Sequence, residues 1–184
     1  MVAVLAVNET RKGHEMTAHP ALDLAFMAAF TFLVVFAVVT DVTRLIIPNW
    51  ISISLVALFA AFIVIGGRPL PFGTHALVAA AVLVLGFAAF AAGWMGGGDV
   101  KLMAALALWA GPDAVAPFLF YMSLIGLALA LAVRAAMNYL RWFENAEGVI
   151  ELSRLFPRWV RRGLTPYGFA IGVGALMTIP ARFF

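Results

Sequence analysis

The chain has 184 residues, of which 65% are hydrophobic and 11% charged, with a formal net charge of +3. A soluble domain contains about 45–50% apolar and about 25% charged residues. The composition therefore excludes an ordinary soluble enzyme and predicts an integral membrane protein. The absence of cysteine excludes disulfides, thiolate metal sites and cysteine nucleophiles. Basic residues of membrane proteins usually mark cytoplasmic loops, so the positive charge does not indicate a nucleic-acid partner.

Six apolar segments follow a mixed, mostly polar tail at residues 1–20. They cover residues 21–40, 50–65, 76–92, 99–111, 114–137 and 165–183. A bilayer is crossed by about 20 residues, with a range of about 17–25. The fourth segment is too short for this, so it is either a short tilted helix or a re-entrant helix shielded by the others. We predict one all-α membrane domain at residues 21–184 with about six transmembrane helices.

The basic residues of the loops predict the orientation in the membrane. If all six segments cross, one side carries Arg44, Lys101, Arg134, Arg141, Arg154, Arg158, Arg161 and Arg162, and the other carries Arg11, Lys12, Arg68 and Arg182. Because cytoplasmic loops are enriched in lysine and arginine, the first side is expected in the cytoplasm, with both termini outside. Residues 138–163 have apolar residues at helical spacing between arginines. We expect a cytoplasmic amphipathic helix there, lying on the bilayer and broken near Pro157.

Two aspartates stand at the edges of apolar segments on this same predicted side. Asp41 follows the first segment, and Asp99 ends a Gly-Gly-Gly-Asp run at the head of the fourth. Separately, Asp41 could be an interfacial charge paired with Arg44, and Asp99 could be a helix N-cap. Carboxylates at a membrane segment are nevertheless costly and indicate a functional site. Two that meet can share a proton and activate water, as in aspartic proteases.

These motifs together resemble the type IV prepilin peptidase family, which are membrane aspartic proteases of the GxGD class. The resemblance spans residues 41–174 and rests on four motifs. They are Asp41 with Ile47-Pro48-Asn49, the run Gly96-Gly97-Gly98-Asp99, its continuation Val100-Lys101-Leu102-Met103-Ala104-Ala105, and Thr165-Pro166-Tyr167-Gly168. The resemblance implies a GxGD-type architecture with Asp41 and Asp99 as the catalytic pair and with no cofactor or metal. His14, His19 and His75 are scattered without ligand spacing, which agrees with this expectation.

The resemblance also implies a set of supporting positions. Those expected to bind substrate or support catalysis are Gly96, Gly97, Gly98, Lys101, Arg44, Pro48, Asn49, Pro166, Tyr167 and Gly168. Lys101 is expected to anchor its helix end or contact substrate, and Arg44 and Asn49 either orient Asp41 or are structural. The small residues Gly168, Gly172 and Gly174 are expected to pack the last segment closely on a neighbour. Trp94 is expected to be an interfacial anchor.

The lack of cysteine bears on the branch of the family. Long members carry a cysteine-paired insert associated with N-methylation, for which this chain has neither cysteines nor space. The chain is therefore similar to the short, peptidase-only enzymes of Flp (tight-adherence) pilins and archaeal preflagellins, without methyltransferase activity. The implied substrate is a prepilin with a basic cytoplasmic leader and a membrane helix, cut at the cytoplasmic face of the inner membrane. The pilus-assembly machinery is a candidate partner.

The resemblance implies that one aspartate takes a proton from water while the other donates one to the scissile carbonyl. The N–H groups at the start of segment 99–111 favour an ionised Asp99, leaving Asp41 as the proton holder. Two other functions stay open. A proton-coupled transporter would use the aspartates as a relay and predicts carboxylates near the bilayer midplane. A catalytically silent assembly scaffold is disfavoured by the presence of both aspartates.

Overall fold

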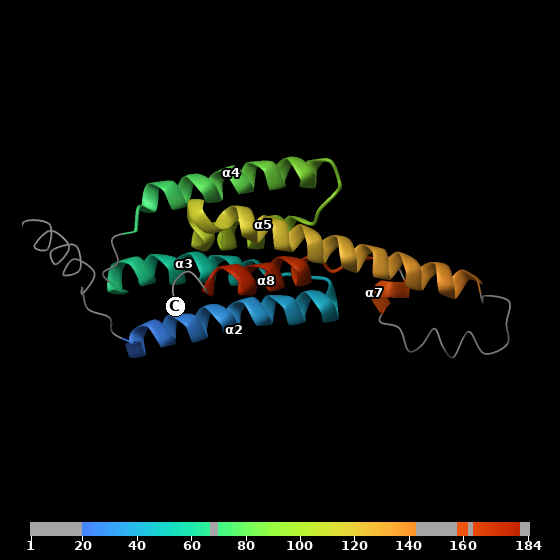
Figure 1. The fold of residues 1–184 in the computed structure, drawn as a ribbon, viewed down its shortest axis with the longest axis horizontal. Helices are drawn as coiled ribbons and strands as arrows, with labels where there is room; N and C mark the ends of the chain where they lie inside the picture. The colour runs from blue at the N-terminus through green and yellow to red at the C-terminus, as the bar shows by residue number, and fades with distance from the viewer. Residues whose placement is uncertain (1–19, 67–69, 143–157, 162–163, 181–184) are drawn as a thin grey trace, which may run out of the picture.

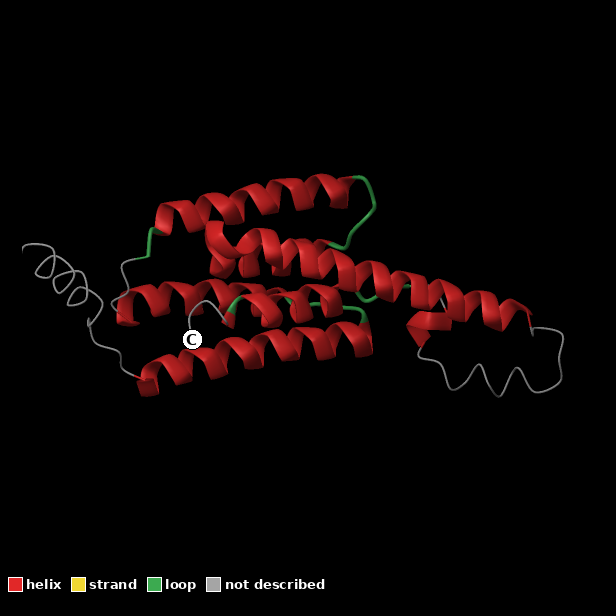
Figure 2. Ribbon diagram, viewed as in Figure 1, coloured by secondary structure: helices red, strands yellow, loops and turns green. Residues whose placement is uncertain are grey.

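A computed structural model of the chain describes residues 20–66, 70–142, 158–161 and 164–180. Its regular elements in this part of the chain are all helices (Figure 2), which confirms the predicted all-α class. They are α2 (Pro20–Arg44), α3 (Asn49–Gly66), α4 (Phe72–Ala91), α5 (Gly97–Trp142), α7 (Arg158–Arg161) and α8 (Tyr167–Thr178). The helices α2, α3, α4 and α5 are long and apolar enough to cross a membrane, and α8 is a shorter apolar helix.

The helices form a bundle in which α2 and α4 lie at opposite edges, with α3, α8 and the first part of α5 between them (Figure 1). The helix α2 packs on α3 and α8, whereas α5 packs on α3, α4 and α8. Because α2, α3 and α4 alternate in direction, the end of α2 and the start of α5 lie at the same end of the bundle. The predicted same-side placement of the two aspartate segments is thus found in the fold.

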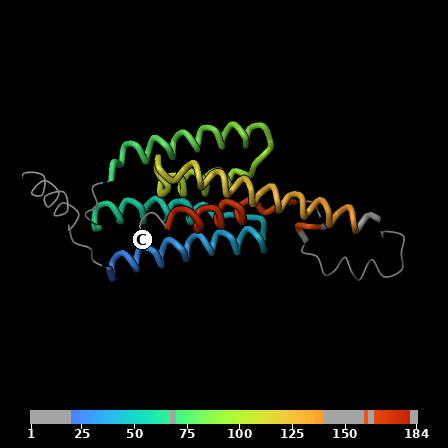
Figure 3. The backbone as a smooth tube through the Cα atoms, in the orientation of Figure 1, coloured from blue at the N-terminus to red at the C-terminus, as the bar shows by residue number. Residues whose placement is uncertain are grey.

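The helix α5 consists of two arms joined at Gly111, where the chain reverses direction (Figure 3). The backbone there has φ 61° and ψ −169°, a conformation that is essentially restricted to glycine. The ring of His75, from α4, packs against Gly111, and its Nδ1 lies 2.7 Å from the main-chain oxygen of Leu108. The break therefore separates the fourth and fifth predicted segments where the sequence placed it.

The first arm of α5 is short and enclosed by the other helices. Residues 97–110 extend about 21 Å at about 1.5 Å per residue, less than the roughly 30 Å of a bilayer core. Residues 102–111 are all buried. The fourth segment is therefore a helix shielded by protein, which is one of the two arrangements expected for it.

An aromatic cluster holds this first arm in place. Trp109 packs against Phe30, Phe59 and Phe62 with ring centroids 4.9–5.5 Å apart. Its indole N–H donates a 3.0 Å hydrogen bond to the main-chain oxygen of Leu55 in α3. Because lipid is as apolar as these rings, shape fit and this hydrogen bond hold the arm, not exclusion from water.

Several predicted boundaries differ from the structure. Pro20 already belongs to α2, and residues 1–19 of the expected tail lie outside the described residues. Residues 138–142 continue α5 because no breaker interrupts the helix there, so the expected amphipathic helix does not begin at 138. Its later part is described only as the four-residue α7, and its break near Pro157 lies outside the described residues.

Candidate active site

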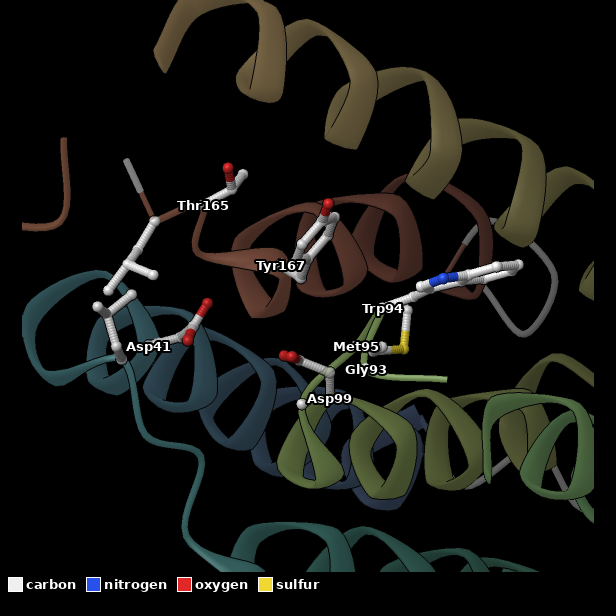
Figure 4. A pocket seen from close by; sticks show the side chains of 10 residues that line it. Asp41, Gly93, Trp94, Met95, Asp99, Thr165 and Tyr167 are labelled. Atoms are coloured by element: carbon white, nitrogen blue, oxygen red, sulfur yellow. The ribbon is translucent and has the colours of Figure 1, made fainter. Parts of the chain in front are cut away.

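The side chains of Asp41 and Asp99 line one cavity of about 530 Å³ at the end of the bundle. Asp41 comes from the last turn of α2 and Asp99 from the first turn of α5, and their carboxylates point toward one another (Figure 4). The cavity is lined by Asp41, Leu45, Gly93, Trp94, Met95, Gly96, Asp99, Leu164, Thr165 and Tyr167. Two acidic groups that are far apart in the sequence therefore line the same cavity.

Asp41 is held by the N-terminus of α8. Its carboxylate is buried, with 5% of the residue exposed. The main-chain N–H of Phe169 donates to Asp41 Oδ2 at 3.2 Å, and the N–H of Gly168 also points at this carboxylate. The first N–H groups of a helix have no partner within the helix. The Phe169 N–H also lies 3.3 Å from the main-chain oxygen of Pro166, so Asp41 adds a second acceptor at the α8 N-terminus, and α8 fixes the direction of the Asp41 side chain.

Gly168 allows this contact because it has no side chain. A Cβ at this position would lie 2.8 Å from Asp41 Oδ2 and 2.7 Å from Ile47 Cδ1, closer than real Cβ atoms approach other atoms. Pro166 precedes the helix as its N-cap, where its missing N–H costs no hydrogen bond. The Pro-Tyr-Gly motif therefore builds a helix start on which a carboxylate can rest directly.

Asp99 is held by the start of its own helix. It is the third residue of α5, and its carboxylate contacts the main chain of Gly96, the residue before the helix. This return contact is the second half of a capping box. Asp99 is thus not the N-cap, as one interpretation of the sequence had it. Both aspartates face a helix N-terminus, so the helix-dipole argument does not distinguish which of them holds the proton.

The three glycines before Asp99 differ in how closely they are packed. A Cβ on Gly96 would lie 2.8 Å from Asp99 Oδ2, and one on Gly98 would lie 3.2 Å from Ile47 Cβ and 3.3 Å from Ile47 O. A Cβ on Gly97 would first meet Phe90 at 3.4 Å, an ordinary contact distance. The structure therefore gives a physical reason for the Gly-x-Gly-Asp pattern, with Gly97 at the open position.

The other predicted supporting residues surround the pair without all reaching it. Lys101 Nζ donates to Asn49 Oδ1 at 2.9 Å, which ties the start of α5 to the start of α3. This bond fits the structural alternative expected for Asn49 and the anchoring alternative expected for Lys101. Arg44 is an exposed residue at the end of α2, and Pro48 leads into α3.

The loop between α4 and α5 contributes residues that the sequence did not single out for the site. Gly93, Trp94 and Met95 line the cavity, and Gly93 turns the chain with φ 76°. Trp94 is 79% exposed and its side chain lies beside the cavity (Figure 4), whereas its expected position at the membrane interface stays a prediction. Thr165 also lines the cavity, just before the Pro-Tyr-Gly motif. The sequence signal that could have identified these residues is that each stands next to one of the recognised motifs.

The position of the aspartates along their helices bears on the alternatives. Both lie within one turn of a helix end, whereas a transporter relay predicted carboxylates near the bilayer midplane. Within the described part of the chain, no three His, Asp or Glu residues are grouped so that they could hold a metal ion. The expectation of a metal-free site stays a prediction.

The fold and cavity define a helical, multi-pass membrane protein with paired carboxylates at one end of its bundle. The sequence model of the type IV leader peptidase family matches residues 27–131, which include both aspartates. This is more than half of the chain, which therefore belongs to the type IV leader peptidase family, as its motifs predicted. No curated protein and no solved structure matches the chain.

Proposed function

We propose that the protein is an aspartic endopeptidase that removes the short leader from Flp-like type IV prepilins. Asp41 and Asp99 converge on one cavity from two different helices, and this is the observation that carries the proposal. Membership of the leader peptidase family supports a peptidase with a prepilin-type substrate. The basic loops support an active site facing the cytoplasm in the inner membrane, and the absence of cysteine supports a peptidase without methyltransferase activity.

In the proposed reaction the two carboxylates have different protonation states, because two close like charges cannot both ionise cheaply. The ionised carboxylate takes a proton from water, and the water oxygen attacks the scissile carbonyl carbon. The protonated carboxylate donates its proton to the carbonyl oxygen. Collapse of the tetrahedral intermediate breaks the C–N bond, and the leaving amine takes up a proton.

The protein's contribution is the fixed geometry of the pair. The N–H groups of Gly168 and Phe169 direct Asp41, and the Gly96 main chain directs Asp99. Holding reacting groups in position is a large part of catalysis, and a misplacement of about 1 Å can cost about 10²-fold in rate. The N-termini of α8 and α5 therefore hold the two carboxylates in position.

The test is co-expression with a Flp-type prepilin, with leader removal scored by gel shift and mass. The wild type is compared with Asp41→Asn and Asp99→Asn at equal membrane levels. Asparagine keeps the size of the side chain but cannot exchange the proton, so either change should lower cleavage by at least about 10²–10⁴-fold. Cleavage that survives either substitution would refute the catalytic pair. If the wild type cleaves none of a panel of prepilins and pilus assembly is intact in both variants, the result would favour the catalytically silent assembly scaffold.

A further inference from the structure

A second cavity of about 280 Å³ lies between the second arm of α5 and α8, and we call it the α5–α8 groove. Its lining is apolar apart from the hydroxyl groups of Ser123 and Tyr167. Small residues contribute much of its wall, with Ser123, Gly126 and Ala130 from α5 and Ala170 from α8. In membranes, small residues at a helix surface allow another helix to approach closely.

The groove adjoins the cavity that holds the aspartates. Met95 and Tyr167 line both spaces, so one end of the groove lies beside the candidate active site. Residues 123–130 of α5 extend about 10 Å at about 1.5 Å per residue, so its length is about two helical turns.

The far end of the groove is closed by direct helix packing. A Cβ on Gly174 would lie 2.9 Å from the main-chain nitrogen of Met122, so α8 and α5 touch there through their backbones. One turn nearer the aspartates, a Cβ on Gly126 would lie 3.6 Å from Ala170 Cβ, and space remains beside it. The two helices therefore separate toward the catalytic end, and the gap points at the aspartate cavity.

We propose that the α5–α8 groove receives the apolar membrane helix of the protein substrate, with Ser123 and Ala130 as specificity-determining positions. The proposal rests on the proposed function. A substrate that is cut at the end of a membrane helix needs an apolar surface for the helix beside a cavity with two carboxylates. The groove provides the apolar surface, and the adjoining cavity provides the carboxylates. A lipid chain needs only the apolar surface. The volume suits a few side chains on one face of a helix, so the rest of that helix would face lipid.

Filling the groove tests this with two substrates. One is a membrane-anchored Flp-type prepilin, and the other is a short peptide spanning the cleavage site without the apolar helix. Ser123→Leu and Ala130→Leu should each lower cleavage of the anchored prepilin by about tenfold or more, because both residues line the groove and neither is buried against α8. Cleavage of the short peptide should stay within about twofold, since the aspartate pair is untouched. Ala128→Leu is the matched control, because Ala128 is exposed on the same arm and does not line the groove.

Two outcomes of that comparison would overturn the proposal. One is unchanged cleavage of the anchored prepilin by both groove variants. The other is an equal loss with both substrates, which would show that the substitutions disturb the catalytic pair and not docking of a helix. Two separate groove positions are used so that the result does not depend on the folding of one variant.

Photo-crosslinking separates this proposal from the proposed function. A crosslinking amino acid at 123, 130 or 128 is placed in an Asp41→Asn, Asp99→Asn background that keeps the prepilin intact. Prepilin adducts from 123 and 130, but not from 128, are the expected result. Adducts with lipid alone, or equal prepilin adducts from all three positions, would refute docking in the groove. Cleavage that fails in the wild type would refute the proposed function whatever the crosslinks show.

Discussion

The Gly-Gly-Gly-Asp run allows an alanine scan in which neighbouring, chemically identical changes should have different outcomes. In Gly96→Ala the new Cβ would lie 2.8 Å from Asp99 Oδ2. Comfortable contacts begin near about 3.5 Å, so the carboxylate must move by roughly 0.5 Å or more. A misplacement of about 1 Å can cost about 10²-fold, so we expect cleavage to fall by about 10- to 100-fold.

The same change at the next position should be nearly silent. In Gly97→Ala the Cβ would first meet the ring of Phe90 at 3.4 Å, which needs no rearrangement. Gly97 is the first residue of α5, where loss of glycine restricts the unfolded chain and can add about 0.4–1 kcal/mol of stability. We expect unchanged cleavage and an equal or higher Tm.

Gly98→Ala should fall between these two results. Its Cβ would lie 3.2 Å from Ile47 Cβ and 3.3 Å from Ile47 O, so the loop between α2 and α3 must yield by a few tenths of an ångström. Overpacking of this kind costs about 1–3 kcal/mol, so Tm should drop. Cleavage should fall by less than in Gly96→Ala, because no catalytic atom is contacted.

The assay is the initial rate of leader removal from purified prepilin in proteoliposomes. The Tm of each variant is measured in detergent, with one detergent used for all variants. Normalising the rate to folded enzyme separates displacement of Asp99 from loss of protein. Equal losses at all three positions would refute the reasoning from the Cβ distances. So would a wild-type rate for Gly96→Ala or a large loss for Gly97→Ala.

Three further predictions concern the supports of the site. Gly168→Ala should lower the cleavage rate by about 10- to 100-fold, because its Cβ would lie 2.8 Å from Asp41 Oδ2; a normal rate in the proteoliposome assay would contradict this. Lys101→Met and Asn49→Ala remove the same 2.9 Å hydrogen bond, so a double-mutant cycle of unfolding free energies should give a coupling of about 0.5–1.5 kcal/mol; additive effects would show that the bond contributes nothing to stability. Gly111→Ala should cost at least about 1–3 kcal/mol, seen as a lower Tm, because φ is 61° there; an unchanged Tm would argue against the break.

Much of the architecture follows from local sequence patterns. Apolar runs of sufficient length predict membrane helices whatever their neighbours, because the bilayer interior requires every backbone group to be satisfied within the segment. The predicted segments 99–111 and 114–137 placed a break between two helical arms, and the structure breaks there at Gly111, where only glycine readily adopts the backbone conformation. The cost of carboxylates in an apolar chain likewise indicated Asp41 and Asp99 before any fold was known.

Some alternatives stayed open in the sequence because they depend on how separate helices pack. Asn49 was expected either to orient Asp41 or to be structural, and in the fold it accepts a hydrogen bond from Lys101. The sequence alone does not reveal this pairing, because it depends on the start of α3 lying beside the start of α5.

The sequence by itself determined that this is an α-helical membrane protein with two acidic groups that are costly unless they serve a purpose. Only the tertiary structure decided what holds them. Asp41 rests on the N–H of Phe169, which lies 128 positions away, and the contact exists because Gly168 lets α8 approach α2. The α5–α8 groove likewise has no local signal. Such contacts depend on the distance between helices, which is set by packing across the whole bundle and by no single segment.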